Sequence, residues 1–138
     1  LEKVGVTVVR SRVEDLGRSF FDSLEAGDLL FIDSSHMIRP QGDVLFEFLE
    51  LLPTLAPGVV VHIHDIFTPR DYPDSWVRQR VRMWNEQYLL EAMLAHSTRY
   101  QVMAGLNHLK HSAYDELAAA CPYLTPDREP GSFYLRVV

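Results

Sequence analysis

The chain has 138 residues, the length of one domain, and its 47% of apolar residues predicts a continuous core and excludes a disordered linker. Its formal net charge of −6 argues against a nucleic-acid partner, and the single Cys121 cannot form an internal disulfide. No apolar run approaches the roughly 20 residues that span a bilayer, and no segment has a signal-peptide layout, so we expect a cytoplasmic protein with no membrane partner.

The first half of the chain is predicted to form three strands of a parallel sheet. The segments Val4–Val9, Asp28–Asp33 and Val59–Ile66 are short and almost continuously apolar, which is typical of strands buried on both faces. Between the second and third segments, apolar residues recur at helical spacing over Pro40–Leu55. The order strand, helix, strand predicts a βαβ unit and an α/β fold.

The second half of the chain is predicted to alternate loops, helices and strands. In chain order we expect a loop at Thr68–Asp74, a long helix at Ser75–Ala95, a strand at Tyr100–Leu106, a short helix at Ala113–Ala120, a loop at Cys121–Gly131 and a strand at Phe133–Val138. Ser112 followed by Asp115 has the pattern of a capping box that opens the short helix.

Two neighbouring predicted strands end in clusters of polar side chains. One strand runs into Asp33-Ser34-Ser35-His36, and the next ends in His62-Ile63-His64-Asp65. Because ligands of open parallel sheets bind beyond the carboxyl ends of the strands, these clusters are the candidate site. Asp33, His64 and Asp65 offer oxygen and nitrogen ligands to one metal ion. His36 lies on the following loop, and a histidine there is suited to accept a proton near neutral pH.

Structural roles compete with these functional ones. An aspartate at a strand end, such as Asp33, also serves as a helix cap or a loop anchor. For His62 the stronger expectation is a buried, hydrogen-bonded core histidine. Trp76 and Trp84 stand at helical spacing, which favours a core or interface position over a substrate-binding role.

The ordered set of these features resembles a known family. The carrying motifs are FIDSSH after one strand, a helix ending in LAPG, then VVVHIHDIFTPRDYP, with WNEQYLL further on. Together they resemble class I S-adenosylmethionine-dependent methyltransferases, most closely the small-molecule O-methyltransferases related to macrocin O-methyltransferase and, more distantly, catechol O-methyltransferase. The resemblance implies a Rossmann-like, mostly parallel sheet with a terminal antiparallel strand, here Phe133–Val138.

The resemblance also implies roles for individual residues. Asp33, His64 and Asp65 would bind a divalent metal, usually magnesium, and His36 would be the general base that takes the proton of the acceptor hydroxyl. The loop that contains Ser11, Val13 and Glu14 would lie against the adenine of S-adenosylmethionine, and the cofactor-binding set also includes Asp33, Ser34 and Ser35.

The sequence departs from the family pattern in two ways. A carboxylate usually stands where this chain has His64, and a nitrogen ligand shifts the preference of a site from magnesium toward transition metals. The glycine-rich turn and the acidic ribose-binding residue that follow the family's first two strands are both missing, and the sequence contains no G-x-G. We therefore expect residues 1–138 to be the C-terminal part of a methyltransferase domain without its first two strands, and to be inactive alone. The open sheet edge that this leaves favours self-association or strand exchange.

Three functions remain open from the sequence. The leading one is metal-assisted methyl transfer to a hydroxyl of a small molecule such as a sugar or a polyketide-like acceptor. A metal-dependent oxygenase or hydrolase would use Asp33, His62, His64 and Asp65, because two histidines and a carboxylate form the non-haem iron triad. The third is a non-catalytic remnant that keeps the methyltransferase fold.

Overall fold

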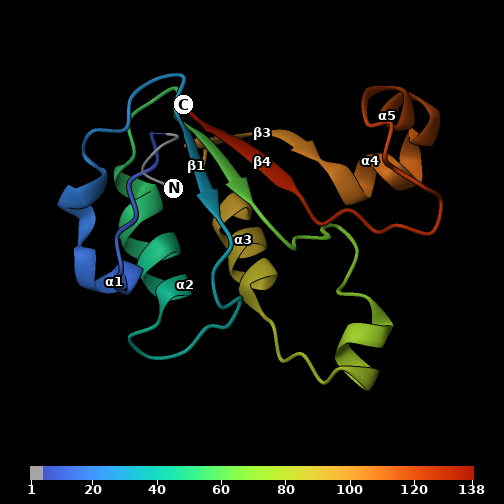
Figure 1. Cartoon of the computed structure of the whole chain (residues 1–138), viewed down its shortest axis with the longest axis horizontal. Coiled ribbons are helices and arrows are strands. Elements are labelled where there is room, and N and C mark those ends of the chain that lie inside the picture. Colours follow the sequence, from blue (N-terminus) through green and yellow to red (C-terminus); the bar gives the residue numbers. More distant parts are fainter. Residues whose placement is uncertain (1–4) are drawn as a thin grey trace.

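The computed structural model describes residues 5–138 and has a mixed α/β fold around one sheet (Figure 1). The strands are β1 (Leu29–Ile32), β2 (Val60–Ile63), β3 (Tyr100–Gly105) and β4 (Phe133–Val137). The helical segments are α1 (Val13–Leu16), η2 (Arg18–Phe21), α2 (Asp43–Leu45), η3 (Phe46–Leu51), η4 (Leu52–Thr54), η5 (Ser75–Gln79), α3 (Glu86–Ala95), α4 (Leu106–Ser112) and α5 (Tyr114–Ala120). Within residues 5–138, no helix has the length and apolar character that crossing a membrane requires.

The sheet has the strand order β1-β2-β4-β3. Strand β1 pairs in parallel with β2, whereas β4 lies antiparallel between β2 and β3. Strands β1, β2 and β3 therefore run in one direction, and β4 alone is reversed. This arrangement confirms the predicted α/β class and the mostly parallel, Rossmann-like sheet with a terminal antiparallel strand, present here as a partial fold.

The core lies on one face of the sheet. Alternate residues of the strands point toward this face and are almost fully buried, as the period of two in a strand requires. The helical run from α2 to η4 and the helix α3 supply the facing side chains. The largest contributors from both sides are Val61, Ile63, Leu135, Val44, Phe48, Leu52 and Leu90.

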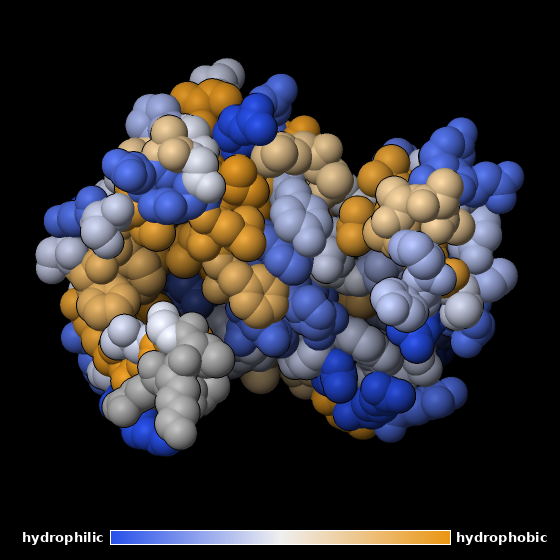
Figure 2. Space-filling view, turned by 45° about the horizontal axis from the view of Figure 1, so that its top comes forward, coloured by the Kyte–Doolittle hydropathy of each residue, from blue (hydrophilic) through white to orange (hydrophobic). Residues whose placement is uncertain are grey.

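The opposite face of the sheet is open, which corrects the prediction that the strands are buried on both faces. Leu29 and Phe31 of β1 are 55% and 52% exposed, and His62 and Tyr134 beside them are half-buried. Figure 2 shows apolar surface in the middle of this side of the molecule. The prediction was wrong because no helix among the described residues covers this face.

The predicted strand at Val4–Val9 is absent from the described sheet. Val4 lies outside the described residues, and residues 5–9 belong to no strand. The side chains of Val6, Val8 and Val9 are exposed instead. An apolar, β-branched segment forms a strand only when another strand pairs with it, and no backbone hydrogen bond joins residues 5–9 to β1 in the part of the chain that the structure describes.

The long helix predicted at Ser75–Ala95 is interrupted between η5 and α3. Val81 has a left-handed backbone with φ of 51°, which no α-helix accommodates. The guanidinium of Arg82 lies 4.3 Å and 4.2 Å from the ring centroids of Trp76 and Trp84, and these cation–π contacts hold the non-helical segment in place. The apolar residues whose spacing predicted one helix belong instead to two short helices, η5 and α3, with a non-helical segment between them.

The first residues of the segment between β2 and α3 are also hydrogen-bonded to α3. The Gln87 side chain of α3 accepts a hydrogen bond from the Phe67 amide at 2.7 Å and donates one to the Arg70 carbonyl at 2.8 Å. The Tyr72 hydroxyl accepts a third bond from the Gln87 amide at 3.1 Å. Residues 67–72 are therefore fixed to the first turn of α3.

The region between β3 and β4 contains two helices where one was predicted. Helix α4 begins at Leu106, which was predicted to end a strand, and continues through residues 107–112, for which no helix was predicted. The predicted capping box does not form, because α5 begins after Ala113 without a side-chain cap and the Ser112 hydroxyl donates to the His108 carbonyl at 2.8 Å. These helices form a lobe beside the sheet, at the right of Figure 1.

Candidate functional site

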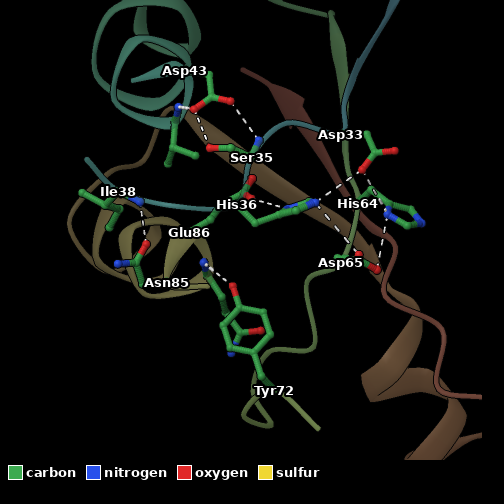
Figure 3. Close-up of polar contacts among 12 residues, drawn as sticks. Asp33, Ser35, His36, Ile38, Asp43, His64, Asp65, Tyr72, Asn85 and Glu86 are labelled. Atoms are coloured by element: carbon green, nitrogen blue, oxygen red, sulfur yellow. Dashed lines mark hydrogen bonds and ion pairs between the residues drawn. The ribbon is translucent and has the colours of Figure 1, made fainter. Parts of the chain in front are cut away.

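The four side chains predicted from the two strand ends come together at the carboxyl edge of the sheet (Figure 3). His36 Nε2 lies 3.4 Å from Asp33 Oδ1 and 4.0 Å from Asp65 Oδ2. His64 Nδ1 lies 3.4 Å from Asp33 Oδ1 and 3.3 Å from Asp65 Oδ1. The two carboxylates thus lie between two imidazoles, as the end-to-end alignment of neighbouring parallel strands predicts.

The backbone turns sharply at both strand ends. His36 and Asp65 have φ values of 58° and 56°, in the left-handed region that non-glycine residues seldom adopt. Such conformations persist where the surrounding structure over-determines them, and they cluster at functional sites. Gly131 packs behind one of these turns, where a Cβ atom would lie 2.8 Å from Asp65 Cα. The turn at Asp65 is therefore held from behind by a residue that must be small.

His36 is held by a carboxylate that the sequence reasoning did not identify. Its Nδ1 lies 2.7 Å from Oε2 of Glu86, the first residue of α3. Glu86 is 0% exposed and His36 is 5% exposed. The contact fixes the imidazole so that Nε2 faces Asp33 and Asp65. Glu86 lies in the WNEQYLL segment, where it was read as one more residue of a long helix.

Burial and charge act in opposite directions on this pair. Burial lowers the pKa of His36, but the hydrogen bond and charge of Glu86 and the nearby Asp65 and Asp33 outweigh it, and the net pKa is raised. Burial also raises the pKa of Glu86, and His36 opposes that effect. Each residue therefore stabilises the charged form of the other.

The backbone around His36 is fixed to the start of α3. The His36 carbonyl accepts hydrogen bonds from the amides of Asn85 at 3.0 Å and Glu86 at 3.4 Å. The Asn85 side chain accepts a further bond from the Ile38 amide at 2.6 Å, and the Trp84 ring packs on the His36 imidazole at a centroid distance of 4.2 Å. The interruption of the predicted long helix thus places Trp84, Asn85 and Glu86 around the candidate base.

The three predicted metal ligands differ in exposure. The side chains of Asp33, His64 and Asp65 are 50%, 40% and 15% exposed. His64 Nδ1 is itself buried and makes no hydrogen bond. This unpartnered nitrogen between two carboxylates fits a divalent cation in its chemistry, although in residues 5–138 no group of three or more His, Cys, Asp or Glu side chains is arranged to hold one.

Of the predicted cofactor residues, Asp33, Ser34 and Ser35 lie together after β1. The Ser35 amide and hydroxyl both donate to the Asp43 carboxylate at the start of α2, at 2.8 Å and 2.6 Å. The Ser34 hydroxyl is buried without a hydrogen-bond partner. Nearby on η3, burial raises the pKa of Glu47 to about 7, against the opposing effect of Ser34. The Ser34 hydroxyl therefore lies buried close to the Glu47 carboxyl group.

The other predicted cofactor residues lie around α1. Ser11 is exposed, Val13 is half-buried, and Glu14 is paired with Arg12. Arg12 also donates to the Gln41 carbonyl at 3.1 Å, which joins α1 to the loop before α2. A cavity of about 720 Å³ separates α1 from α2, and Glu14 lines it. Of the three predicted residues around α1, Glu14 lines this cavity, whereas Ser11 and Val13 do not.

His62 stays outside the cluster. Its ring stacks on Tyr134 at a centroid distance of 4.3 Å and lies 4.7 Å from Phe31. Burial lowers its pKa, and its Nε2 has no hydrogen-bond partner, so the predicted hydrogen-bonded core position is wrong. The half-buried ring lies instead on the open face of the sheet.

A second cavity adjoins the site on the side of the α4–α5 lobe. It has a volume of about 540 Å³ and is lined by His64, Asp65 and Trp76 together with residues of α4, α5 and the segment 121–132. Of the four clustered residues, His64 and Asp65 therefore open onto a space large enough for a small molecule, whereas His36 and Asp33 do not line it.

The sequence of residues 2–66 matches a family described as a methyltransferase domain. The matched residues include Asp33, His36, His64 and Asp65, and they end where β2 and its polar cluster end. No curated protein and no solved structure gives a significant match. The match to residues 2–66, the Rossmann-like sheet and the polar cluster at its carboxyl edge together indicate similarity to a methyltransferase domain.

Proposed function

We propose that this protein catalyses metal-assisted O-methylation in the cytoplasm, within the macrocin O-methyltransferase-like group. The acceptor is a hydroxyl of a small molecule such as a sugar or a polyketide-like compound. The observation that carries the proposal is the buried His36–Glu86 pair, whose geometry turns Nε2 of His36 toward two carboxylates at the edge of the sheet. A general base must be oriented in this way toward the group that it deprotonates.

The chemistry of the step follows from this arrangement. S-adenosylmethionine, when bound, supplies a methyl group on a positively charged sulfur. His36 Nε2 accepts the hydroxyl proton as the acceptor oxygen forms its bond to the methyl carbon, and the carbon–sulfur bond breaks with its electron pair going to sulfur. Glu86 stabilises the imidazolium, and Trp84 shields one face of the ring from water. The products are a methyl ether and S-adenosylhomocysteine.

A divalent cation is the second component of the proposal. Asp33, His64 and Asp65 would hold it, and the unpartnered Nδ1 of His64 supports that role. When bound, the cation would lower the pKa of the acceptor hydroxyl. Because the set includes an imidazole, magnesium and a transition metal are both chemically suitable.

The cofactor contacts complete the proposal. Ser11, Val13 and Glu14 on the α1 side, and Asp33, Ser34 and Ser35 after β1, are proposed to bind S-adenosylmethionine on its adenine side. The cavity beside α1, which Glu14 lines, supports this placement.

The test separates the roles of Asp33 and His36 in a form of the protein that shows turnover. Asp33→Ala should abolish metal binding and activity together, because it removes a proposed ligand. His36→Ala should keep metal and cofactor affinity but lower turnover by roughly 10²–10⁴-fold, the usual contribution of a general base. The measurements are metal affinity by calorimetry and methyl transfer from labelled S-adenosylmethionine.

Two results would contradict the assignments. If His36→Ala loses the metal as completely as Asp33→Ala, His36 is a ligand and not the base. If its turnover is unchanged, the histidine has no catalytic role. Stoichiometric iron in the purified protein, with no methyl transfer, would instead favour the oxygenase function.

A further inference from the structure

The cavity beside His64 and Asp65 has an apolar body. Besides these two residues, its wall includes Trp76 from η5, Leu106 from α4, Leu117 from α5 and Leu124. The indole of Trp76 lies 5.2 Å from that of Trp84, which packs on His36, so one aromatic row leads from the cavity to the candidate base. An acceptor in this cavity would have its hydroxyl at the His64 and Asp65 end.

The α4–α5 side of the cavity carries a free positive charge. Arg128 lines the wall and forms no ion pair with any residue that the structure describes. The carboxylate of the neighbouring Glu129 is paired with other side chains, since it accepts hydrogen bonds from Asn107, Lys110 and His111. Asp127 does not line the cavity. The guanidinium of Arg128 is therefore available to an anionic group of a ligand.

We infer that this cavity binds the methyl acceptor, and that the acceptor has a flat apolar body with a hydroxyl at one end and a carboxylate or similar anion that Arg128 binds. The inference rests on the proposed function and narrows its acceptor class, because a leucine- and tryptophan-lined wall suits an aromatic or polyketide-like body better than a free sugar. A volume of about 540 Å³ falls within the range of small-molecule sites.

The test measures binding without S-adenosylmethionine, using three probes on the full chain. A hydroxynaphthoate has the hydroxyl, the apolar body and the carboxylate; the matching naphthol lacks the carboxylate; and methyl glucoside lacks the apolar body. Calorimetry should show the hydroxynaphthoate binding at least about tenfold tighter than either of the others, since a charge-assisted contact is worth about that factor or more.

Two variants locate the binding site. Arg128→Gln should remove the preference for the hydroxynaphthoate over the naphthol, and Leu124→Asn should weaken both. Arg136→Gln is the matched control, because Arg136 is an exposed arginine of β4 that does not line the cavity.

The inference is overturned if the naphthol binds as tightly as the hydroxynaphthoate, if Arg128→Gln and Arg136→Gln behave alike, or if no probe binds. Adding S-adenosylmethionine separates this result from the proposed function. Tight hydroxynaphthoate binding supports the cavity, and it counts against the methyltransferase assignment if no methyl transfer occurs in a form of the protein that also binds S-adenosylmethionine. Methylation of the glucoside without hydroxynaphthoate binding supports the methyltransferase assignment and overturns the acceptor class.

Discussion

His36 and Glu86 are 50 positions apart in the chain, and their contact defines which nitrogen of the imidazole carries the proton. A carboxylate at Nδ1 favours the tautomer with the proton on Nδ1 and leaves Nε2 free to accept one. Glu86→Ala should therefore shift the neutral ring toward the opposite tautomer and lower turnover about 10- to 100-fold, less than loss of the base itself. Nitrogen-15 chemical shifts of the His36 ring report the tautomer directly.

The matched control for this prediction is Glu91→Gln. Glu91 lies on the same helix and accepts a hydrogen bond from Thr68, without contact to His36. Glu86→Gln keeps an acceptor oxygen for Nδ1 and should preserve more of the original tautomer than Glu86→Ala. An unchanged His36 spectrum in Glu86→Ala would show that Glu86 is only a buried structural group.

At the scale of elements, Glu129 connects helix α4 to the segment before β4. Burial alone would raise its pKa, but hydrogen bonds from Lys110, His111 and Asn107 lower it to about 2. A carboxylate whose folded pKa lies below its unfolded value of about 4.3 stabilises the fold above that value, and the contribution disappears as the pH falls toward 2. Glu129→Gln should therefore lower the melting temperature at pH 7, with a difference from wild type that shrinks steadily below about pH 4.

Thermal unfolding of the two proteins across this pH range checks the prediction. Glu50→Gln serves as the control, because Glu50 is exposed and forms no ion pair with the described residues. Its melting temperature should follow that of wild type at every pH. A pH-independent difference for Glu129→Gln would mean that packing, and not charge, accounts for the destabilisation.

The elements also show how far sequence reasoning reaches. The convergence of Asp33, His36, His64 and Asp65 was predictable, because neighbouring parallel strands end at the same edge of a sheet. Glu86 was not, because a charged residue at the start of a helix is usually solvated, and nothing local signals that its partner lies on a distant loop. Helical spacing over Ser75–Ala95 failed for a related reason. The same apolar periodicity arises when two short helices pack on different neighbours.

The burial of each sheet face and the pairing of the edge strands were harder still to predict. An apolar run indicates burial, but it does not say which face is covered or whether a partner strand is available. Phe31 and Val8 both lie in segments that were read as buried strands, and both are 52% exposed. Their environments depend on elements whose pairing the sequence does not specify.

At the scale of the whole molecule, the outer edge of β1 and residues 5–9 are both unpaired in the described structure. We predict that residues 5–9 of one copy pair with the β1 edge of another, because an open edge beside an exposed β-prone segment favours association. Val8→Pro removes a backbone donor and should weaken self-association without altering the stability of the monomer. Sedimentation over a range of concentrations measures this.

Val8→Thr is the control, since it keeps the amide and the β-branched shape and should associate like wild type. A chain that stays monomeric at high concentration in all three forms would contradict the prediction. So would a Val8→Pro variant that associates normally.

The affinity of residues 1–138 for S-adenosylmethionine is a further property of the whole molecule. The sequence contains no G-x-G turn, which the resemblance to class I methyltransferases implies would hold the methionine part of S-adenosylmethionine. Without those charge-assisted contacts, each worth roughly 1.5–3 kcal/mol, residues 1–138 alone should bind S-adenosylmethionine far more weakly than micromolar. Calorimetry that gives a micromolar dissociation constant would contradict this, and would show that the contacts on the adenine side suffice.

The attachment of residues 67–85 to α3 has a consequence for engineering. Gln87 holds the first residues of this segment by hydrogen bonds to Phe67 and Arg70. The His36 carbonyl holds its end by accepting hydrogen bonds from the amides of Asn85 and Glu86. The residues between these anchors can lengthen or shorten at little entropic cost, because loop closure depends only weakly on length. Trp76 lies between the anchors and lines the proposed acceptor cavity. Exchanging residues 73–83 should therefore change which molecules the cavity admits, while Trp84, Asn85 and Glu86 keep His36 in its position.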